Sequence, residues 1–339
     1  DRPLVSVLQD LAEMERRQGI VRTAGRRFQF DHQQIRDVVY EDLPERLREE
    51  YHAMTAEAHA ATADFDPIFV ADHHLRGSRP EGARPCLDAV GEMLRHRDAE
   101  EDVVEIASRA LRRPGLLEPD ARMDLVVRLA LHLASLSRTV EARELLSEAL
   151  AATDDAGQKA RAYRALADQF SVSGQPDEAQ RMLAEASRHA AQSDIRYIGA
   201  DIDSSRSQAA WLRGDLTEAR EAAEAYLAVT REVGKPSFIA FALNRLGGIA
   251  TEQGEHEDAE GYLDEAEAIA QSDQPSRQRM FGGNYRSVLL WRMGRFTEAR
   301  ELFEDHLERA RTLAHRRAEL YAHANLGELA LRMGRPPQA

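Results

Sequence analysis

A glycine recurs every 40 residues through the second half of the chain, at Gly174, Gly214, Gly254, Gly294 and Gly334. Five residues after each of the first four glycines comes an alanine: Ala179, Ala219, Ala259 and Ala299. Two of the surrounding stretches are close copies, WLRGDLTEAREAAEAYL at 211–227 and WRMGRFTEARELFEDHL at 291–307. Because a fixed internal period of about 20 to 50 residues is the mark of a repeat architecture, this spacing constrains the fold more than any other feature.

Each repeat predicts a hairpin of two antiparallel helices. Apolar residues recur with helical spacing on both sides of the glycine, and glycine tolerates the backbone conformation that a tight turn needs. The repeat alanine lets the two helices approach, and a large residue four positions later fills the remaining interface: Leu183, Leu263 and Phe303. Since one hairpin cannot bury its apolar face alone, we expect the hairpins to stack into an all-α solenoid.

This pattern resembles that of the tetratricopeptide repeat (TPR) family. Its order of Leu-Gly/Ala, Gly, Ala and a large residue is found in RALADQFSVSGQPDEAQRMLAEA (164–186) and LNRLGGIATEQGEHEDAEGYLDEA (243–266). The resemblance implies a right-handed superhelix, and the period exceeds the usual length of about 34 residues, so we expect longer helices or loops. The last unit, ANLGELALRMGRPPQA (324–339), holds only a first helix. We therefore expect it to be truncated, with a dimer contact at the open C-terminal end.

The N-terminal part has a different pattern. Residues 4–18 predict an amphipathic helix, and apolar stretches on either side of Thr23-Ala24-Gly25 predict a short β-hairpin. Further helices are predicted from Asp31 and over 47–61. We interpret these elements as a small winged-helix-like module. The predicted organisation is a winged-helix-like segment at 1–62, degenerate helical repeats or a linker at 63–118, and a TPR array at 119–339.

The stretch FQFDHQQIRDVVYEDL (28–43) resembles the segment that joins ATPase and repeats in the STAND class of signal-transduction ATPases. That class includes ATP-dependent transcription regulators and multidomain Ser/Thr kinases with TPR tails. The resemblance implies that His32 senses nucleotide in the parent protein, although Gln33 stands where the family has Asp. The alternative is that His32 caps or packs its helix. No G-x-x-x-x-G-K-[ST] motif occurs, so we expect no cofactor here, while ATP could bind elsewhere in the parent.

Charge and composition exclude several classes of function. The net charge of −14 repels phosphate backbones, so nucleic-acid binding by the whole chain is not expected. A local basic group could form a DNA-reading wing, a solvated surface or a docking face for the ATPase domain: Arg16, Arg17, Arg22, Arg26 and Arg27.

No stretch approaches the roughly 18 apolar residues of a membrane span. The single cysteine, Cys86, is typical of a reducing compartment, so we expect a cytoplasmic protein.

The sequence contains no recognisable catalytic or metal-binding constellation. No Gly-x-Ser-x-Gly motif, Cys–His pairing or paired carboxylates stand out, so we expect no enzymatic activity from this chain. Asp72, His73 and His74 are adjacent, but successive side chains on a helix point about 100° apart and rarely share an ion. We therefore predict no metal site.

The candidate binding residues lie on the first helix of each unit, which lines the inner surface of a TPR superhelix. Two asparagines one period apart, with aromatic rings nearby, suit an extended peptide because amides bond its backbone while rings cover its apolar groups. Arg206 and Arg286 replace the usual leucine. They either reach into the groove to hold an anionic group, or snorkel or pair with a nearby Glu. The candidates are Arg164, Asp168, Asp201, Arg206, Gln208, Phe241, Asn244, Phe281, Asn284, Arg286, Trp291 and Tyr321.

These features favour a non-enzymatic regulatory domain that binds a protein, a peptide or a small inducer in a concave groove. In a larger signal-transduction ATPase, kinase or transcription regulator, the ligand would bias the contact between the array and the missing ATPase domain. Two alternatives remain open at this point. One is a passive scaffold for protein assembly, and the other is DNA binding through the winged-helix segment.

Overall fold

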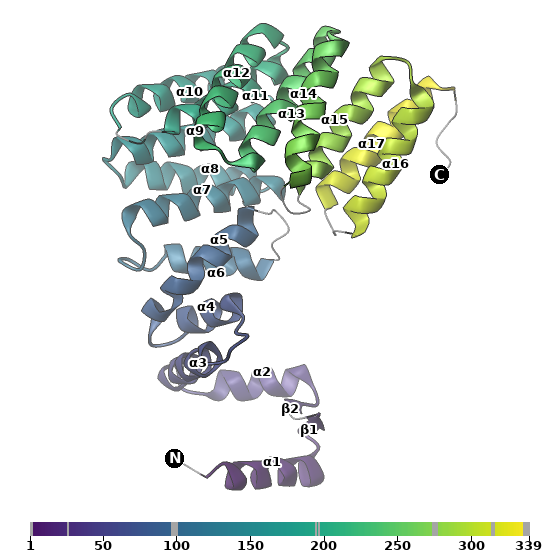
Figure 1. The fold of residues 1–339 in the computed structure, drawn as a ribbon. Helices are drawn as coiled ribbons and strands as arrows, with labels where there is room; N and C mark the ends of the chain where they lie inside the picture. Colours follow the sequence, from purple (N-terminus) through teal and green to yellow (C-terminus); the bar gives the residue numbers. More distant parts are fainter. Residues whose placement is uncertain are drawn as a thin grey trace. The chain divides into compact units, whose positions relative to one another are not determined.

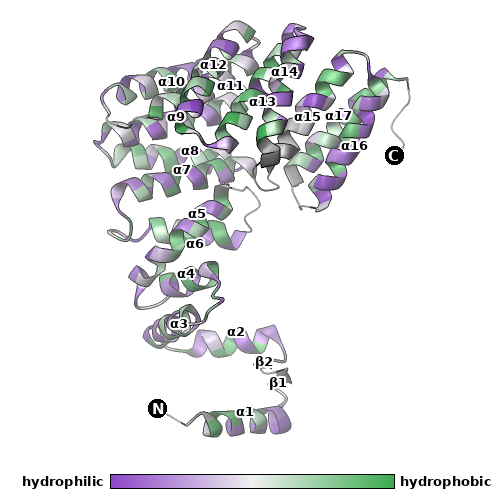
Figure 2. Cartoon of the chain, viewed as in Figure 1, coloured by the Kyte–Doolittle hydropathy of each residue, from purple (hydrophilic) through white to green (hydrophobic). Residues whose placement is uncertain are grey.

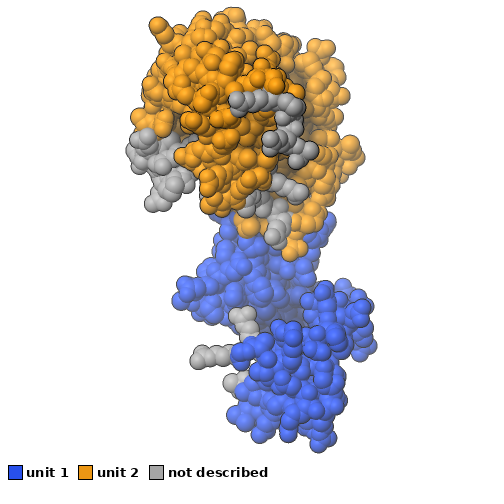
Figure 3. Space-filling model, turned by 90° about the vertical axis from the view of Figure 1, so that its right-hand side faces the viewer, with its two compact units in different colours: residues 1–90, 105–117 blue, residues 91–104, 118–339 orange. Residues whose placement is uncertain are grey.

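The structure is a computed structural model that describes residues 3–25, 27–95, 101–193, 195, 197–272, 277–312 and 316–334. The chain forms two compact units (Figure 3). Unit 1 contains residues 1–90 and 105–117, and unit 2 contains residues 91–104 and 118–339.

Unit 1 is helical apart from one β-hairpin near its start (Figure 1). Its elements include α1 (Leu4–Gln18), β1 (Val21–Ala24), β2 (Arg27–Phe30), α2 (Gln33–Asp42), α3 (Glu45–Ala60), α4 (Pro67–Arg76) and a 3-10 helix (Pro80–Cys86). Helices α5 (Leu87–Arg95) and α6 (Glu101–Leu111) contribute residues to both units.

The predicted N-terminal elements are confirmed. The helix over 4–18 is α1, and β1 and β2 form an antiparallel hairpin in which Val21 pairs with Phe30. The backbone N–H and the hydroxyl of Thr23 donate to the Glu15 carboxylate at 2.6 and 2.7 Å, which joins β1 to α1. Helix α2, however, contains no buried residue, so these elements share no common core with it. The winged-helix module therefore stays a prediction.

Unit 2 contains a solenoid of antiparallel helix pairs, as predicted (Figure 1). The pairs are α7 (Pro119–Ser135) with α8 (Thr139–Ala151), α9 (Ala156–Val172) with α10 (Pro176–Ala190), α11 (Ile198–Arg213) with α12 (Leu216–Val233), α13 (Pro236–Gln253) with α14 (His256–Ser272), and α15 (Arg277–Arg292) with α16 (Phe296–Thr312). Helix α17 (Arg316–Arg332) is the first helix of a further unit.

The 40-residue period is accommodated by long helices. Helices α11 to α16 have 16 to 18 residues each, and only two residues separate α12 from α13. The repeat glycines end the first helices in the left-handed region, with φ of 85° at Gly214 and 80° at Gly254. The sequence period therefore marks the turn between the two helices of each hairpin.

In two of the hairpins, a small residue of the first helix packs against the second helix. A Cβ atom on Gly247 would lie 2.8 Å from the side chain of Leu263, so only glycine fits there beside that leucine. At the equivalent position of the preceding hairpin, the buried Ser207 hydroxyl donates to the backbone oxygen of Ala219 at 2.8 Å. Apolar and polar residues interleave along the array helices (Figure 2). The apolar side chains are buried where neighbouring helices pack against one another.

The part of the chain that the structure describes holds no helix with the length and apolar character to cross a bilayer. It also holds no group of three or more His, Cys, Asp or Glu side chains arranged to hold a metal ion.

Candidate ligand-binding surface

The predicted binding residues lie on α9, α11, α13, α15 and α17, whose shared surface we call the first-helix surface. Helices α9 and α11, and likewise α13 and α15, pack closely, whereas α11 and α13 make few close backbone contacts. Side chains bridge these two helices. Trp211 of α11 and Tyr285 of α15 both lie over Gly248 of α13, where an added Cβ atom would come within 2.4 Å of the indole. The two rings stack with centroids 6.0 Å apart.

The structure brings three predicted residues, Arg164, Asp168 and Asp201, into one polar group. Arg164 of α9 forms an ion pair with Asp168 at 3.0 Å and donates to the Ser205 hydroxyl of α11 at 3.4 Å. Burial among neighbouring groups raises the pKa of Asp201, and Asp168 adds to that rise while Arg164 and Arg161 oppose it. This part of the surface therefore carries fixed charges of both signs.

Helix α13 contributes Phe241 and Asn244, and beside them an arginine that the sequence did not suggest. Asn244 is only 4% exposed, and its Oδ1 atom has no hydrogen-bond partner among the described residues. The guanidinium of Arg245 lies over the Phe241 ring, 4.9 Å from its centroid, and donates to the backbone oxygen of Ser204 on α11. Burial lowers the pKa of Arg245 and raises that of Tyr226 to about 12. Tyr226 packs edge-on against Phe241.

A second polar contact joins α15 and α17. Asn284 accepts a hydrogen bond from the Asn325 amide at 2.8 Å. Trp291 packs into the apolar core of α15, α16 and α17, and the guanidinium of Arg332 lies over its ring at 5.3 Å. Tyr321 is exposed on α17. The binding roles of Asn284 and Tyr321 stay predictions, whereas Trp291 packs in the core of this hairpin.

The remaining candidates are not drawn into these groups. Arg206 pairs with Asp203 at 3.0 Å, and Arg286 pairs with Asp264 and Glu267 of α14. Arg286 thus has a Glu among its partners, as one alternative expected, whereas the partner of Arg206 is an Asp. Gln208 is half-buried on α11. The side chain of Phe281 lies outside the described residues.

His32 lies in unit 1, at the N-cap position of α2. Its side chain makes no capping hydrogen bond, is 72% exposed, and approaches Asp31 at 3.4 Å. Neither capping nor packing therefore accounts for this residue. Its role in nucleotide sensing stays a prediction.

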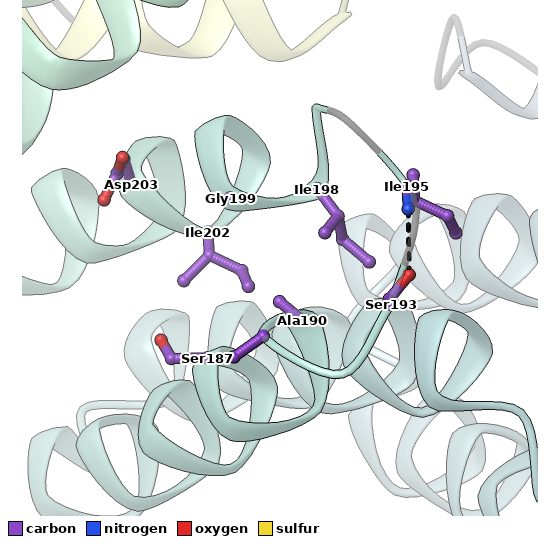
Figure 4. Close-up of a pocket in the computed structure, with 9 residues that line it drawn as sticks. Ser187, Ala190, Ser193, Ile195, Ile198, Gly199, Ile202 and Asp203 are labelled. Carbon is purple, nitrogen blue, oxygen red and sulfur yellow. Dashed lines mark hydrogen bonds between the residues drawn. The ribbon is translucent and has the colours of Figure 1, made fainter.

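A cavity of about 530 Å³ lies between the end of α10 and the start of α11 (Figure 4). Its lining is largely apolar: Ile198 and Ile202 of α11 face Ala190 of α10, and Ile195 lies in the connection between the two helices. Burial raises the pKa of Asp203 at its edge, and Arg206 opposes that rise. None of the candidate residues lines this cavity.

A second cavity of similar size lies on α17, lined by His323, Ala324, Gly327, Glu328, Leu331 and Arg332. Gly327 is the counterpart of Gly247, but a Cβ atom added there would meet nothing within 4 Å. In the α13–α14 hairpin, the second helix covers Gly247 with Leu263, whereas no described atom covers Gly327 on α17 in this way. Dimerisation through this end stays a prediction.

Four residues of this surface are not among those predicted from the sequence: Trp211, Arg245, Tyr285 and Asn325. Arg245 directly follows Asn244, but one helical step rotates a side chain by about 100°, so adjacency gave no reason to include it. Asn325 lies 41 residues after Asn284, one residue out of the repeat register. The repeat period alone could therefore not have found this pair.

Comparison with known proteins supports the repeat assignment. Two family models, both described as tetratricopeptide repeat, match residues 164–237 and 220–274 and residues 284–339. No curated protein is similar enough in sequence to count as a relative of the chain.

Solved structures share the architecture at low sequence identity. One is a Signal Transduction ATPase with Numerous Domains (STAND) protein with a tetratricopeptide repeat sensor, from Pyrococcus horikoshii. It has 17% identity and a TM-score of 0.57, over 98% of this chain and 52% of that one. The chain thus spans about half the length of that protein. A Rap protein complexed with Competence and Sporulation Factor has 14% identity and a TM-score of 0.49, over 97% of this chain and 98% of its own.

The helix pairs, the glycine turns and the family matches agree on one assignment. Residues 164–274 and 284–339 of this chain are tetratricopeptide repeats.

Proposed function

We propose that the first-helix surface binds an extended segment of a protein or peptide, and that the chain is the ligand-sensing part of a larger signal-transduction ATPase. Tetratricopeptide repeats are protein-interaction modules, and no catalytic group is needed for this role. The protein would act in the cytoplasm without a cofactor of its own. A small inducer could occupy the same surface in place of a peptide, and peptide selection distinguishes the two kinds of ligand.

One observation carries the proposal: the buried Oδ1 atom of Asn244 has no hydrogen-bond partner among the described residues. A buried acceptor without a partner costs free energy, and a backbone N–H of an extended ligand would satisfy it. The Phe241 ring on the same helix offers apolar contact to the ligand, and the Asn284–Asn325 pair offers a second set of amide groups. This combination of amides and rings suits a peptide better than a nucleic acid.

Two further observations support the larger assembly. The STAND protein with a similar fold carries its repeats as a sensor, and this chain covers about half of it. The stretch over 28–43 resembles the segment that precedes the repeats in that class. We therefore place the ATPase, and the ATP it would hold, in the rest of the parent protein. DNA binding through unit 1 remains the second alternative, since the net charge of −14 opposes nucleic-acid binding only by the chain as a whole.

The proposal is tested by selecting random linear peptides on the chain and measuring their affinity by calorimetry. Asn244→Leu and Asn284→Leu should each weaken selected peptides about tenfold, which corresponds to one lost hydrogen bond. Glu224→Ala on the exposed side of α12 is the control and should leave the affinity unchanged. Selected peptides that bind both Asn variants as tightly as the original chain would remove the first-helix surface from the proposal.

A sensor and a passive scaffold differ in their effect on the parent protein. In the full-length ATPase, a sensor's ligand should change the rate of ATP turnover, because it binds the two states of the array with different affinity. A ligand that binds tightly and leaves turnover unchanged would favour the scaffold. Selection that returns no peptide, together with a small molecule whose affinity depends on Asn244, would favour the inducer.

A further inference from the structure

The cavity between the end of α10 and the start of α11 lies at a junction where the repeat sequence departs from its next copy along the chain. One repeat period later, the end of α12 meets the start of α13 at the equivalent junction. Three positions that hold a branched aliphatic residue at that junction hold a smaller or polar residue at the cavity. Leu227, Ile239 and Leu243 correspond to Ser187, Gly199 and Asp203, respectively.

The missing aliphatic side chains account for the cavity. Leu227 and Leu243 are buried in one core cluster at the α12–α13 junction, and Ile239 packs against it. At the α10–α11 junction, Ser187 and Gly199 are exposed, and a Cβ atom added to Gly199 would meet nothing within 4 Å. The cavity of about 530 Å³ lies within the range of roughly 300 to 1,000 Å³ that is typical of small-molecule sites. The open space therefore follows from the sequence and is large enough for a ligand.

The cavity has an apolar wall and a polar end (Figure 4). Ile198 and Ile202, both buried residues of α11, face Ala190 of α10 along the wall. Ser187 and Asp203 lie toward one end of the cavity. Their counterparts in the next copy share one core cluster, so these two positions lie on surfaces that pack against each other. A ligand that fills the cavity therefore needs an apolar body and a polar group at one end.

The polar end offers hydrogen-bond acceptors. The Ser187 hydroxyl donates to the backbone oxygen of Leu183 at 2.9 Å, which leaves the Ser187 oxygen free only to accept. The Asp203 carboxylate also accepts, and its ion pair with Arg206 at 3.0 Å uses one of its two oxygens. Burial raises the pKa of Asp203 in spite of this ion pair, so the charged carboxylate is incompletely compensated. A positively charged hydrogen-bond donor is the polar group that fits this end best.

We propose that this cavity binds a small molecule with an aromatic or branched aliphatic body and a protonated amino group. The body lies against Ile198 and Ile202, whose apolar surface it covers. The ammonium group donates to the Asp203 carboxylate and to the Ser187 oxygen, and the bond to the carboxylate is of the strong charge-assisted kind. Among the described residues, none of those predicted to bind a ligand lines the cavity. The inference is therefore independent of the proposed peptide function.

Binding is measured with 2-phenylethylamine, and with 2-phenylethanol and phenylacetate as probes that share its ring and carry a neutral or a negative group. The δ1-methyl NMR signals of Ile198 and Ile202, assigned by their loss in Ile198→Val and Ile202→Val, should shift and saturate with the amine. A probe of this size should bind in the millimolar range, more weakly than a ligand that fills the whole cavity. The alcohol should bind about tenfold more weakly than the amine, and phenylacetate should not saturate the signals.

Two substitutions restore the residues of the next junction and should close the cavity. Gly199→Ile and Ser187→Leu should each abolish the saturable shift, because each places an apolar side chain in the space of the ligand. Neither should lower the melting temperature, since both positions are exposed on their helices and glycine is a poor helix residue. Gly261→Ile in α14 is the matched control, because a Cβ atom added there also meets nothing within 4 Å. It should bind the amine like the original chain.

Asp203→Asn tests the polar end. It keeps the volume of the side chain and removes its charge, so the affinity for the amine should fall about tenfold. The affinity for the alcohol should change little, because a neutral hydroxyl can donate to the amide oxygen as well.

Three results would contradict the inference. No saturable shift with any of the three probes would overturn it and identify the cavity as imperfect packing. Saturation by the amine that survives both Gly199→Ile and Ser187→Leu would place the binding elsewhere. Phenylacetate or the alcohol binding as tightly as the amine would leave the cavity as a site for apolar molecules and remove the amino group from the proposal.

Discussion

Helix α13 of the array and helix α2 of the N-terminal unit both have an apolar stripe in sequence, yet their surroundings are opposite. Eleven of the 18 residues of α13 are buried, whereas none of the 10 residues of α2 is. Val38 and Val39 of the α2 stripe are exposed. An apolar stripe thus predicts a helix, but only a repeated pattern predicts what will cover it.

The two regions are also held together by different contacts. In the array, alanine and glycine of one helix meet leucine or phenylalanine of the next. In unit 1, a chain of polar rings joins α2, α3 and α4. The Tyr40 hydroxyl lies 2.7 Å from His52 Nε2, and His52 Nδ1 lies 2.9 Å from His73 Nδ1. We therefore expect the array to respond to changes of volume, and this part of unit 1 to respond to protons.

The largest effect should come from Phe303→Ala in α16. The Phe303 ring is fully buried among Leu290, Ala299 and Leu329, so its loss leaves a cavity. We expect destabilisation of about 3 to 5 kcal/mol, measured by urea denaturation. Phe296→Ala in the same helix is the control, since that ring is exposed and should cost much less. Equal losses would mean that the array is not held by its buried stripe.

Overpacking should have the next largest effect. Ala259→Leu in α14 adds volume at a fully buried position where the helix faces α13, and we expect a cost of about 1 to 3 kcal/mol. Ala268→Leu in the same helix adds the same volume on an exposed face and should be nearly neutral. Chemical denaturation of both variants provides the measurement. If Ala259→Leu is as stable as its control, the repeat alanine is not what sets the distance between the helices.

These effects follow from features that the sequence does carry. The period of glycines predicted the hairpin turns and the stacking, because each turn needs a left-handed residue and each interface needs a small one. The polar contacts could not be predicted in the same way. Arg245 reaches Ser204 on another helix, and Asn325 reaches Asn284 out of register. Such contacts depend on where a long side chain points, and helical periodicity carries no information about that.

The two histidines of unit 1 should make its stability depend on pH. Burial lowers the pKa of both His52 and His73, and the charge of Arg76 lowers both further. Repulsion from His52 adds to the lowering of the His73 pKa. Asp72 opposes the lowering of both pKa values. The folded state therefore binds fewer protons than the unfolded state near the ordinary histidine pKa of about 6.5. Stability contributed by the neutral pair is complete above that pH and is lost as pH falls toward the lowered values.

Hydrogen exchange of α3 and α4 between about pH 8 and pH 5 would measure this loss. His73→Phe keeps a ring against Phe69, which lies 4.3 Å from His73 between centroids, and removes one titrating group. The pH dependence of protection in α3 should then be weaker than in the original chain. An unchanged slope would show that the histidine pair is not the proton-sensitive contact of unit 1.

The smallest effect should come from an ion pair on the outside of the array. Arg231 of α12 and Glu265 of α14 are 2.7 Å apart, but both side chains are about half exposed. Water and salt screen such a pair, so Arg231→Gln should change stability by about 0.5 kcal/mol or less. A double-mutant cycle with Glu265→Gln isolates the coupling between the two side chains. A coupling well above about 1 kcal/mol would mean that polar contacts hold the array as well, and the contrast with unit 1 would disappear.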